Sequence, residues 1–317
     1  MSTSGERHAA DHAPSHPAES ASPTSAVEVR EGLRAAGYLP AAETALVCHL
    51  ALALGKPILV EGPAGVGKTE LANALARMTA RELIRLQCYE GLDEAKALYE
   101  WNYRKQLLRI QAEREPGWRE VEGDIFTEEY LLARPLLRAI ASEQPVVLLI
   151  DEIDKTDQEF EAMLLELLSD FQISIPELGR VAARTTPLVL LTSNNSRELT
   201  EALKRRCLYL WLDYPSPEHE LAIIRMHTPD LDEQIARRLV EIVALVRTLD
   251  VKKPPSIAES IDWARTLLLL GASAIDRDVL TSTLSVIVKH RADLAVVGER
   301  LGLSGARPGD DDGRQAA

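Results

Sequence analysis

A glycine-rich run early in the chain has the residue types needed to hold a chain of phosphates. The run consists of Gly62, Pro63, Ala64, Gly65, Val66, Gly67, Lys68 and Thr69. It fits the pattern G-x-x-x-x-G-K-[ST], in which glycines let backbone N–H groups crowd around phosphate oxygens. Lys68 can reach the β- and γ-phosphates of a nucleotide, and Thr69 can offer its hydroxyl to Mg²⁺. An apolar segment precedes the run and a helical pattern follows it, so we predict an ATP- and Mg²⁺-binding loop rather than a chance turn.

Two adjacent carboxylates end the most apolar run of the chain. Asp151 and Glu152 follow residues 146–150, which predict a buried central strand of a parallel sheet. At the end of such a strand, Asp151 can hold the water shell of Mg²⁺, and Glu152 can accept a proton from the attacking water. Nearby Asp154 and Lys155 are predicted to be solvated loop residues.

Further polar groups are candidates for the same site. Asn194 follows the next apolar strand pattern, where it can orient the lytic water against the γ-phosphate. Asn195 is the fallback, and a simple turn asparagine is the alternative interpretation. Arg205 and Arg206 precede the last apolar strand pattern. They are either ordinary basic surface or the source of an arginine finger, a cation that neutralises charge developing on the γ-phosphate.

The segments that must position these groups alternate between short apolar runs and helical patterns. Residues 57–60 predict a strand before the glycine-rich loop, and residues 71–80 predict the helix after it. Thr156 and Glu159 have the spacing of a capping box at the start of another helix. Strands that alternate with helices predict an α/β fold with a mostly parallel sheet.

The pattern changes at Ser216, which is followed by a proline at the first position of a predicted helix. From there to about residue 300 only helical periods occur. The N-terminal residues carry almost no large apolar side chain, so they are predicted to be disordered. The predicted parts are this disordered tail, an α/β core, a small helical lid domain and a polar C-terminal tail, over residues 1–26, 27–215, 216–300 and 301–317 in that order.

Composition limits the classes of function. The chain has 317 residues and a formal net charge of -13, which argues against a large nucleic-acid footprint. No segment is long and apolar enough to cross a bilayer, and the N-terminus lacks the apolar core of a signal peptide, so we expect a soluble cytoplasmic protein. Cys48, Cys88 and Cys207 stand far apart and predict reduced thiols; a metal or sulfur-transfer role is the weaker alternative.

The order of these motifs resembles that of AAA+ ATPases over about residues 29–290. The carrying features are the glycine-rich loop, Asp151 with Glu152, the Thr-Ser that precedes Asn194, the Arg-Arg-Cys run and the helical domain. The resemblance implies a five-stranded parallel sheet in the order 5-1-4-3-2 with a helical lid, assembled into a ring, usually a hexamer. It also implies that Arg206, with Arg205 in reserve, acts on ATP held by the neighbouring subunit.

Within that family the chain is most similar to the MoxR type, and there to the CoxD group, linked to maturation of aerobic carbon monoxide dehydrogenase. The stretches that carry this likeness are residues 87–94, 101–108, 175–179 and 205–211. The resemblance implies a partner with a von Willebrand factor A domain and a molybdenum-containing client metalloenzyme. MoxR-type lids usually carry a nucleotide-sensing arginine. The comparable stretch here, residues 255–260, has none, and Arg265 is the alternative two turns later.

Two segments extend the predicted core. Residues 87–145 are long for a crossover and hold much of the aromatic content. Local packing is the simpler interpretation of these aromatics; the other is an inserted loop that faces the pore of a ring and grips a polypeptide. The aromatics concerned are Tyr89, Tyr99, Trp101, Tyr103 and Trp118. Residues 173–181 predict a short hairpin.

The sequence therefore predicts Mg²⁺-dependent ATP hydrolysis that drives remodelling or maturation of a partner protein. One alternative is a nucleic-acid translocase or a clamp-loader-like ATPase, which the acidic balance and the lack of a recognisable DNA-binding module disfavour. A second alternative is a nucleotide-gated scaffold without meaningful turnover. The presence of Lys68, Asp151, Glu152 and Asn194 together disfavours that alternative.

Overall fold

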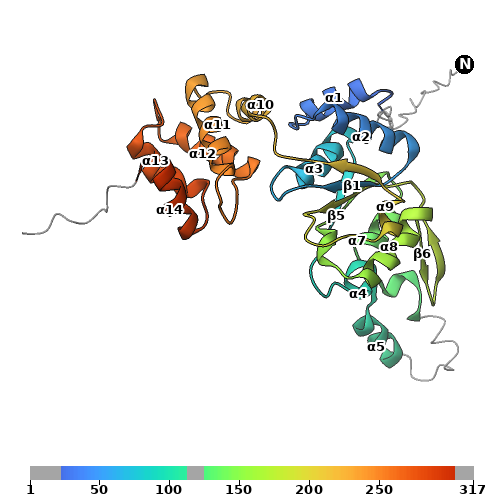
Figure 1. The fold of residues 1–317 in the computed structure, drawn as a ribbon. Helices are drawn as coiled ribbons and strands as arrows, with labels where there is room; N and C mark the ends of the chain where they lie inside the picture. The colour runs from blue at the N-terminus through green and yellow to red at the C-terminus, as the bar shows by residue number, and fades with distance from the viewer. Residues whose placement is uncertain (1–22, 113–124, 304–317) are drawn as a thin grey trace, which may run out of the picture.

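The structure is a computed structural model, and it describes residues 23–112 and 125–303 (Figure 1). Five parallel strands form the central sheet in the order β2-β5-β8-β1-β9. They are β1 (Ile58–Glu61), β2 (Glu82–Gln87), β5 (Val146–Asp151), β8 (Leu188–Ser193) and β9 (Leu208–Trp211). Counted along the chain as first to fifth, these strands have the order 5-1-4-3-2. The predicted sheet topology is therefore confirmed.

Helices cover both faces of this sheet. Cores of Leu, Val, Ile and Ala side chains lie on each face, and the middle strands β5 and β8 are buried throughout, as their continuous apolar sequences require. One face is covered by α1 (Ala26–Ala35), α2 (Ala42–Leu54) and α3 (Lys68–Thr79). The other is covered by α4 (Glu94–Ala97), α7 (Pro135–Ala141), α8 (Gln158–Asp170) and α9 (Glu201–Lys204).

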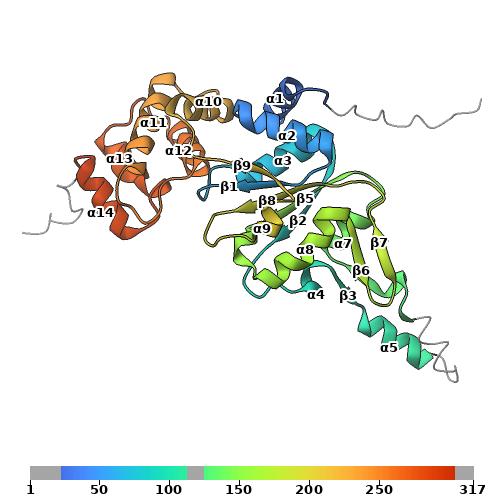
Figure 2. The same ribbon diagram turned by 45° about the vertical axis from the view of Figure 1, so that its right-hand side comes forward.

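The remaining elements of the core project from the second face. The predicted hairpin is confirmed as β6 (Gln172–Ile175) paired antiparallel with β7 (Gly179–Ala182). The long crossover contains β3 (Tyr99–Trp101), α5 (Tyr103–Ala112), a 3-10 turn η1 (Glu128–Tyr130) and β4 (Leu131–Ala133). In both views α5 lies at the end of the core away from the helical domain (Figures 1 and 2).

The crossover aromatics divide into two groups. Trp101 is buried and packs edge-on against Tyr99 and Phe126, which is local packing. Tyr89 and Tyr103 are exposed. Trp118 lies outside the described residues.

The C-terminal part is a separate group of helices with its own core around the fully buried Trp263. Its elements are α10 (Pro217–His227), α11 (Glu233–Arg247), α12 (Ile257–Leu269), α13 (Arg277–Thr283), η3 (Leu284–Val286) and α14 (Arg291–Arg300). The side chain of Ser216 caps α10 and Pro217 is its first residue, as the sequence predicts. None of the helices in the two described ranges is both long enough and apolar enough to cross a membrane.

Most of the predicted disordered tail, residues 1–22, lies outside the described residues. Ser25 caps α1, so this helix begins at Ala26, the last residue of the predicted tail. The predicted capping box is displaced by one residue: Asp157 caps α8 by accepting from the N–H of Phe160. The hydroxyl of Thr156 donates instead to the carbonyl of Ile153, within the preceding turn η2 (Ile153–Lys155). Asp is favoured at the N-cap of a helix at least as strongly as Thr, so Asp157 can take the N-cap of α8 in place of Thr156.

Candidate active site

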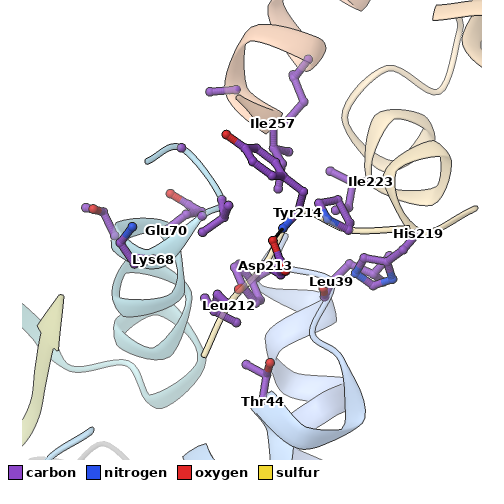
Figure 3. A pocket seen from close by; sticks show the side chains of 18 of the residues that line it. Leu39, Thr44, Lys68, Glu70, Leu212, Asp213, Tyr214, His219, Ile223 and Ile257 are labelled. Carbon is purple, nitrogen blue, oxygen red and sulfur yellow. Dashed lines mark hydrogen bonds between the residues drawn. The ribbon is translucent and has the colours of Figure 1, made fainter. Parts of the chain in front are cut away.

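A cleft of about 930 Å³ lies between the sheet's carboxyl edge and the helical domain. The glycine-rich loop and the start of α3 form one wall, and residues 37–39 and the hinge residues 212–216 form another. Helices α10 and α12 close it from the side of the helical domain. Figure 3 shows Lys68 at the start of α3, with Tyr214 and Ile257 on the opposite side.

The glycine-rich loop has a backbone that side chains would obstruct. Gly62, Gly65 and Gly67 have φ angles of 151°, 78° and 97°, a region that glycine adopts readily. A Cβ on Gly62 would lie 1.9 Å from the carbonyl oxygen of Leu212. The loop thus fits a cradle that brings backbone amides close to phosphate oxygens.

The ammonium group of Lys68 donates hydrogen bonds to three oxygen atoms. Its Nζ donates to the carbonyls of Gly62 and Pro63, each at 2.7 Å, and to Oδ1 of Asn194 at 2.8 Å. Burial lowers the pKa of Lys68, while the charges of nearby carboxylates, led by Asp154 and Asp151, act in the opposite direction. Phosphate oxygens are stronger acceptors than these neutral oxygens, so the residues present fit a bound phosphate chain.

Asp151 accepts more hydrogen bonds than the other carboxylates that line the cleft in the described part of the chain. Its Oδ1 accepts from the hydroxyl of Thr192 at 2.5 Å and from that of Thr69 at 3.1 Å. Its Oδ2 accepts from Arg85 at 2.5 Å. The adjacent oxygens of Thr69 and Asp151 are the hard donors that Mg²⁺ prefers, so this pair fits the predicted metal ion.

Glu152 has a backbone conformation that is unusual for a residue with a side chain. Its φ and ψ are 59° and 49°, in the left-handed region, and its N–H donates to the hydroxyl of Thr192 at 2.9 Å. The carboxylate accepts from Nε2 of Gln87 at 3.2 Å and pairs with Nζ of Lys155 at 2.6 Å. Strained backbones of this kind are concentrated at functional sites. Lys155, predicted to be a solvated loop charge, therefore contacts the proposed base.

Asp154 is not the solvated loop residue that the sequence predicts. Only 4% of it is exposed, and it accepts hydrogen bonds from the N–H of Asn194 at 3.2 Å and the N–H of Ser196 at 3.0 Å. Burial acts to raise the pKa of Asp154, but these bonds and one from the Ser196 hydroxyl hold it below its ordinary value. The turn folds over Asp154, so its charge is enclosed by donors rather than by water.

The structure brings Asn194 to the cleft, where it contacts Lys68. Asn195 does not line the cleft; it has a φ of 58°, and its N–H donates to the hydroxyl of Ser193. Arg205 and Arg206 do not line the cleft of their own chain either. Arg206 donates to Ser169 and to the carbonyl of Ala202 on the outer surface. Their action on a neighbouring subunit stays a prediction.

Arg265 lines the cleft from α12, so a cation is present on the helical domain although residues 255–260 lack one. The three cysteines give no support to a metal or sulfur-transfer role. Burial raises the pKa of each thiol to about 12, so Cys48, Cys88 and Cys207 are protonated near neutral pH.

The sequence analysis assigned no role in the site to Arg85, Gln87 or Thr192. Arg85 and Gln87 lie on β2, and Thr192, the threonine of the Thr-Ser run before Asn194, lies on β8. The one available signal is alternation: Arg85 and Gln87 are polar residues two positions apart on β2, so they point to the same face.

The sheet topology, the loop and the paired carboxylates define a P-loop enzyme that hydrolyses nucleoside triphosphates. Residues 58–210 match the family model described as "ATPase family associated with various cellular activities (AAA)". The matched segment is similar to AAA ATPases and holds the glycine-rich loop, Asp151, Glu152 and Asn194, so the reaction is hydrolysis of ATP.

Relatives of the chain are distant. It is 26% identical to the gas vesicle ATPase GvpN of Haloferax mediterranei, over 73% of this chain and 67% of that protein. It is 24% identical to protein NorQ of Paracoccus denitrificans, over 76% of this chain and 80% of that protein. Among solved structures, the RuvB Holliday junction branch migration motor of Thermotoga maritima aligns with a TM-score of 0.46 and 17% identity, covering 81% of this chain and 69% of that one.

Proposed function

We propose that Glu152 is the base that accepts a proton from the attacking water, and that Asn194 orients that water. In this proposal the glycine-rich loop and Lys68 hold the β- and γ-phosphates, while Thr69 and Asp151 hold Mg²⁺. When bound, Mg²⁺ neutralises charge on the phosphate oxygens. The hydrogen bonds around these two residues support the roles: the carboxylate of Asp151 accepts from the Thr192 hydroxyl, and the backbone N–H of Asn194 donates to Asp154.

We further propose that hydrolysis drives remodelling of a partner protein, as in ATPases of the MoxR type. The observation that carries this proposal is an apolar stripe on α5. Tyr103, Leu107 and Ile110 recur at helical spacing and are 62%, 57% and 37% exposed. Exposed apolar residues gathered on one helical face are typical of a surface that binds another protein.

The crossover that carries α5 is joined directly to the catalytic carboxylates. It begins after Gln87, whose side chain contacts Glu152, and the N–H of Cys88 donates to the carbonyl of Asp151 at 2.8 Å. A force that a bound polypeptide exerts on the crossover is therefore transmitted to the end of β5, next to Glu152. This linkage supports coupling between a bound polypeptide and hydrolysis.

The proposed assembly is a ring of identical subunits, a hexamer, in which Arg206 or Arg205 reaches the neighbour's ATP. The proposed partners are a protein with a von Willebrand factor A domain and a client metalloenzyme of the molybdenum-containing carbon monoxide dehydrogenase type, in the cytoplasm. The CoxD-like stretches of the sequence support this client class. The net charge of -13 and the likeness to a gas vesicle ATPase support a client other than nucleic acid.

The test is a deletion strain complemented with wild type or with Glu152→Gln. The client metalloenzyme should fold and carry its molybdenum cofactor in both strains, yet be active only with wild type, because only wild type completes hydrolysis. Full client activity in the uncomplemented deletion strain would refute the maturation role and leave the ATPase assignment intact.

A further inference from the structure

We propose that the helical domain aligns the phosphate-binding loop directly, through the start of α12, and that Tyr214 and Arg247 are positioning residues for this contact. The proposal concerns the ATPase site and does not depend on the identity of the client.

Two consecutive carbonyls of the loop face the helical domain and the hinge. The N–H of Ile257, the first residue of α12, donates to the carbonyl of Gly65 at 3.1 Å. The hydroxyl of Tyr214 donates to the carbonyl of Ala64 across a longer distance, 3.4 Å. The approach at α12 is close enough that a Cβ on Gly65 would lie 2.2 Å from the Cβ of Ser256. Figure 3 shows Tyr214 beside Ile257 at this junction.

Because each peptide bond is planar, these contacts also determine where the neighbouring N–H groups of the loop point, and these N–H groups can bind phosphate. In a planar trans peptide the C=O and the following N–H point in opposite directions. When the carbonyls of Ala64 and Gly65 face the helical domain, the N–H groups of Gly65 and Val66 therefore face the inside of the loop. Within the described part of the chain, neither N–H donates to another backbone group. The contact thus holds two free donors in the orientation that receives phosphate oxygens.

Arg247 fixes the residues that make this contact. Its guanidinium lies over the ring of Tyr214, 4.5 Å from the ring centroid, and its Nε donates to the carbonyl of Pro255 at 2.9 Å. The same group forms a two-pronged ion pair with Glu220 of α10, which is 1% exposed and also accepts from Ser260. One side chain therefore joins the hinge, α10 and the residue before the cap of α12.

The sharpest test is Ile257→Pro, because it removes the N–H donor and turns the Cδ of the proline ring toward the Gly65 carbonyl, so the contact cannot form. The first residue of a helix makes no intrahelical bond through its N–H, and proline is favoured there. Ser256 is already extended, with φ -79° and ψ 165°, as a residue before proline must be. The matched control is Ile257→Ala, which keeps the N–H and shortens a side chain that also lines the cleft.

We expect Ile257→Pro to bind ADP about 3- to 10-fold more weakly than Ile257→Ala, the equivalent of one ordinary hydrogen bond. Adenosine, which lacks phosphates, should bind the two variants equally. Calorimetry with ADP and competition with adenosine measure both quantities. Equal ADP affinity in the two variants, or equal weakening of ADP and adenosine, would overturn the proposal.

A second variant keeps the test decisive if the proline variant does not fold. Tyr214→Phe removes only the hydroxyl and leaves the ring under Arg247. We expect about a 2-fold loss of ADP affinity, with adenosine binding and the melting temperature unchanged. If Tyr214→Phe binds ADP as wild type does while the proline variant is unfolded, the proposal fails.

Discussion

The carboxylate of Asp154 accepts a hydrogen bond from the backbone N–H of Asn194 at 3.2 Å. Because Asn194 in turn contacts Lys68, the buried Asp154 sets the position of the turn that faces the phosphate-binding lysine. The same carboxylate accepts from Ser196, so one charge organises the whole turn after β8.

We predict that Asp154→Asn lowers the free energy of unfolding by about 1–3 kcal/mol near pH 7 and slows turnover. The folded pKa of Asp154 lies below its ordinary value, so its stabilising contribution is present above the unfolded pKa of about 3.9 and is lost as pH falls through the folded pKa. Urea unfolding between about pH 5 and pH 3 should therefore show a smaller loss of stability in the variant. The exposed carboxylate of Asp170 provides the control: Asp170→Asn should retain the wild-type profile.

Lys68→Ala and Glu152→Gln should separate binding from chemistry. The first removes the cation from the phosphate cradle, so ATP binding should be lost. The second keeps Asp151 and the loop, so ATP should bind while hydrolysis stops. Nucleotide binding and phosphate release measure the two effects. Turnover at the wild-type rate in Glu152→Gln would show that Glu152 is not the base.

We expect Arg206→Ala to impair ATP hydrolysis at the site of the neighbouring subunit. Arg206 does not line its own cleft, so ATP binding should be normal while hydrolysis falls, since loss of an arginine finger costs roughly 10³-fold or more. Mixing the variant with wild type should inhibit more than dilution does. Arg205→Ala is the matched comparison. Activity that declines in simple proportion to the variant fraction contradicts action between subunits and leaves Arg206 a surface residue.

The ion pair between Arg247 and Glu220 predicts a stability effect within the helical domain. Arg247→Met leaves a buried, uncompensated carboxylate, so the domain should lose about 3–5 kcal/mol of stability. Replacing the partner as well, in Arg247→Met with Glu220→Leu, should restore most of that loss. Thermal unfolding followed by circular dichroism is the measurement. A double variant no more stable than Arg247→Met would contradict the uncompensated charge as the cause.

The motifs predictable from sequence are those whose geometry is local. The glycine-rich loop and the pair Asp151 and Glu152 are contiguous, so their spacing alone fixes how they are presented at the end of a strand. The roles of Arg85 and Gln87 depend instead on pairing between distant segments. Parallel register places Gln87 opposite Asp151, and nothing in the sequence near either residue specifies that register.

Asp154 illustrates a different limit. A charged residue in a turn is ordinarily solvated, and only the folding of residues 194–196 over it makes Asp154 a buried acceptor. The shift of the helix cap from Thr156 to Asp157 has a similar cause. Both residues are good caps by type, and the turn that ends at Lys155 engages the threonine hydroxyl first.

The exposed stripe on α5 gives the last prediction, which separates hydrolysis from client work. Leu107→Ser combined with Ile110→Ser should keep ATP hydrolysis near the wild-type rate, because α5 lies away from the cleft. The same variant should lose client activation in the complemented deletion strain, because the apolar contact is removed. Arg104→Gln, an exposed change outside the stripe, should behave as wild type in both assays. Normal client activation by the double-serine variant would exclude this stripe as the client surface and leave the ATPase site unaffected.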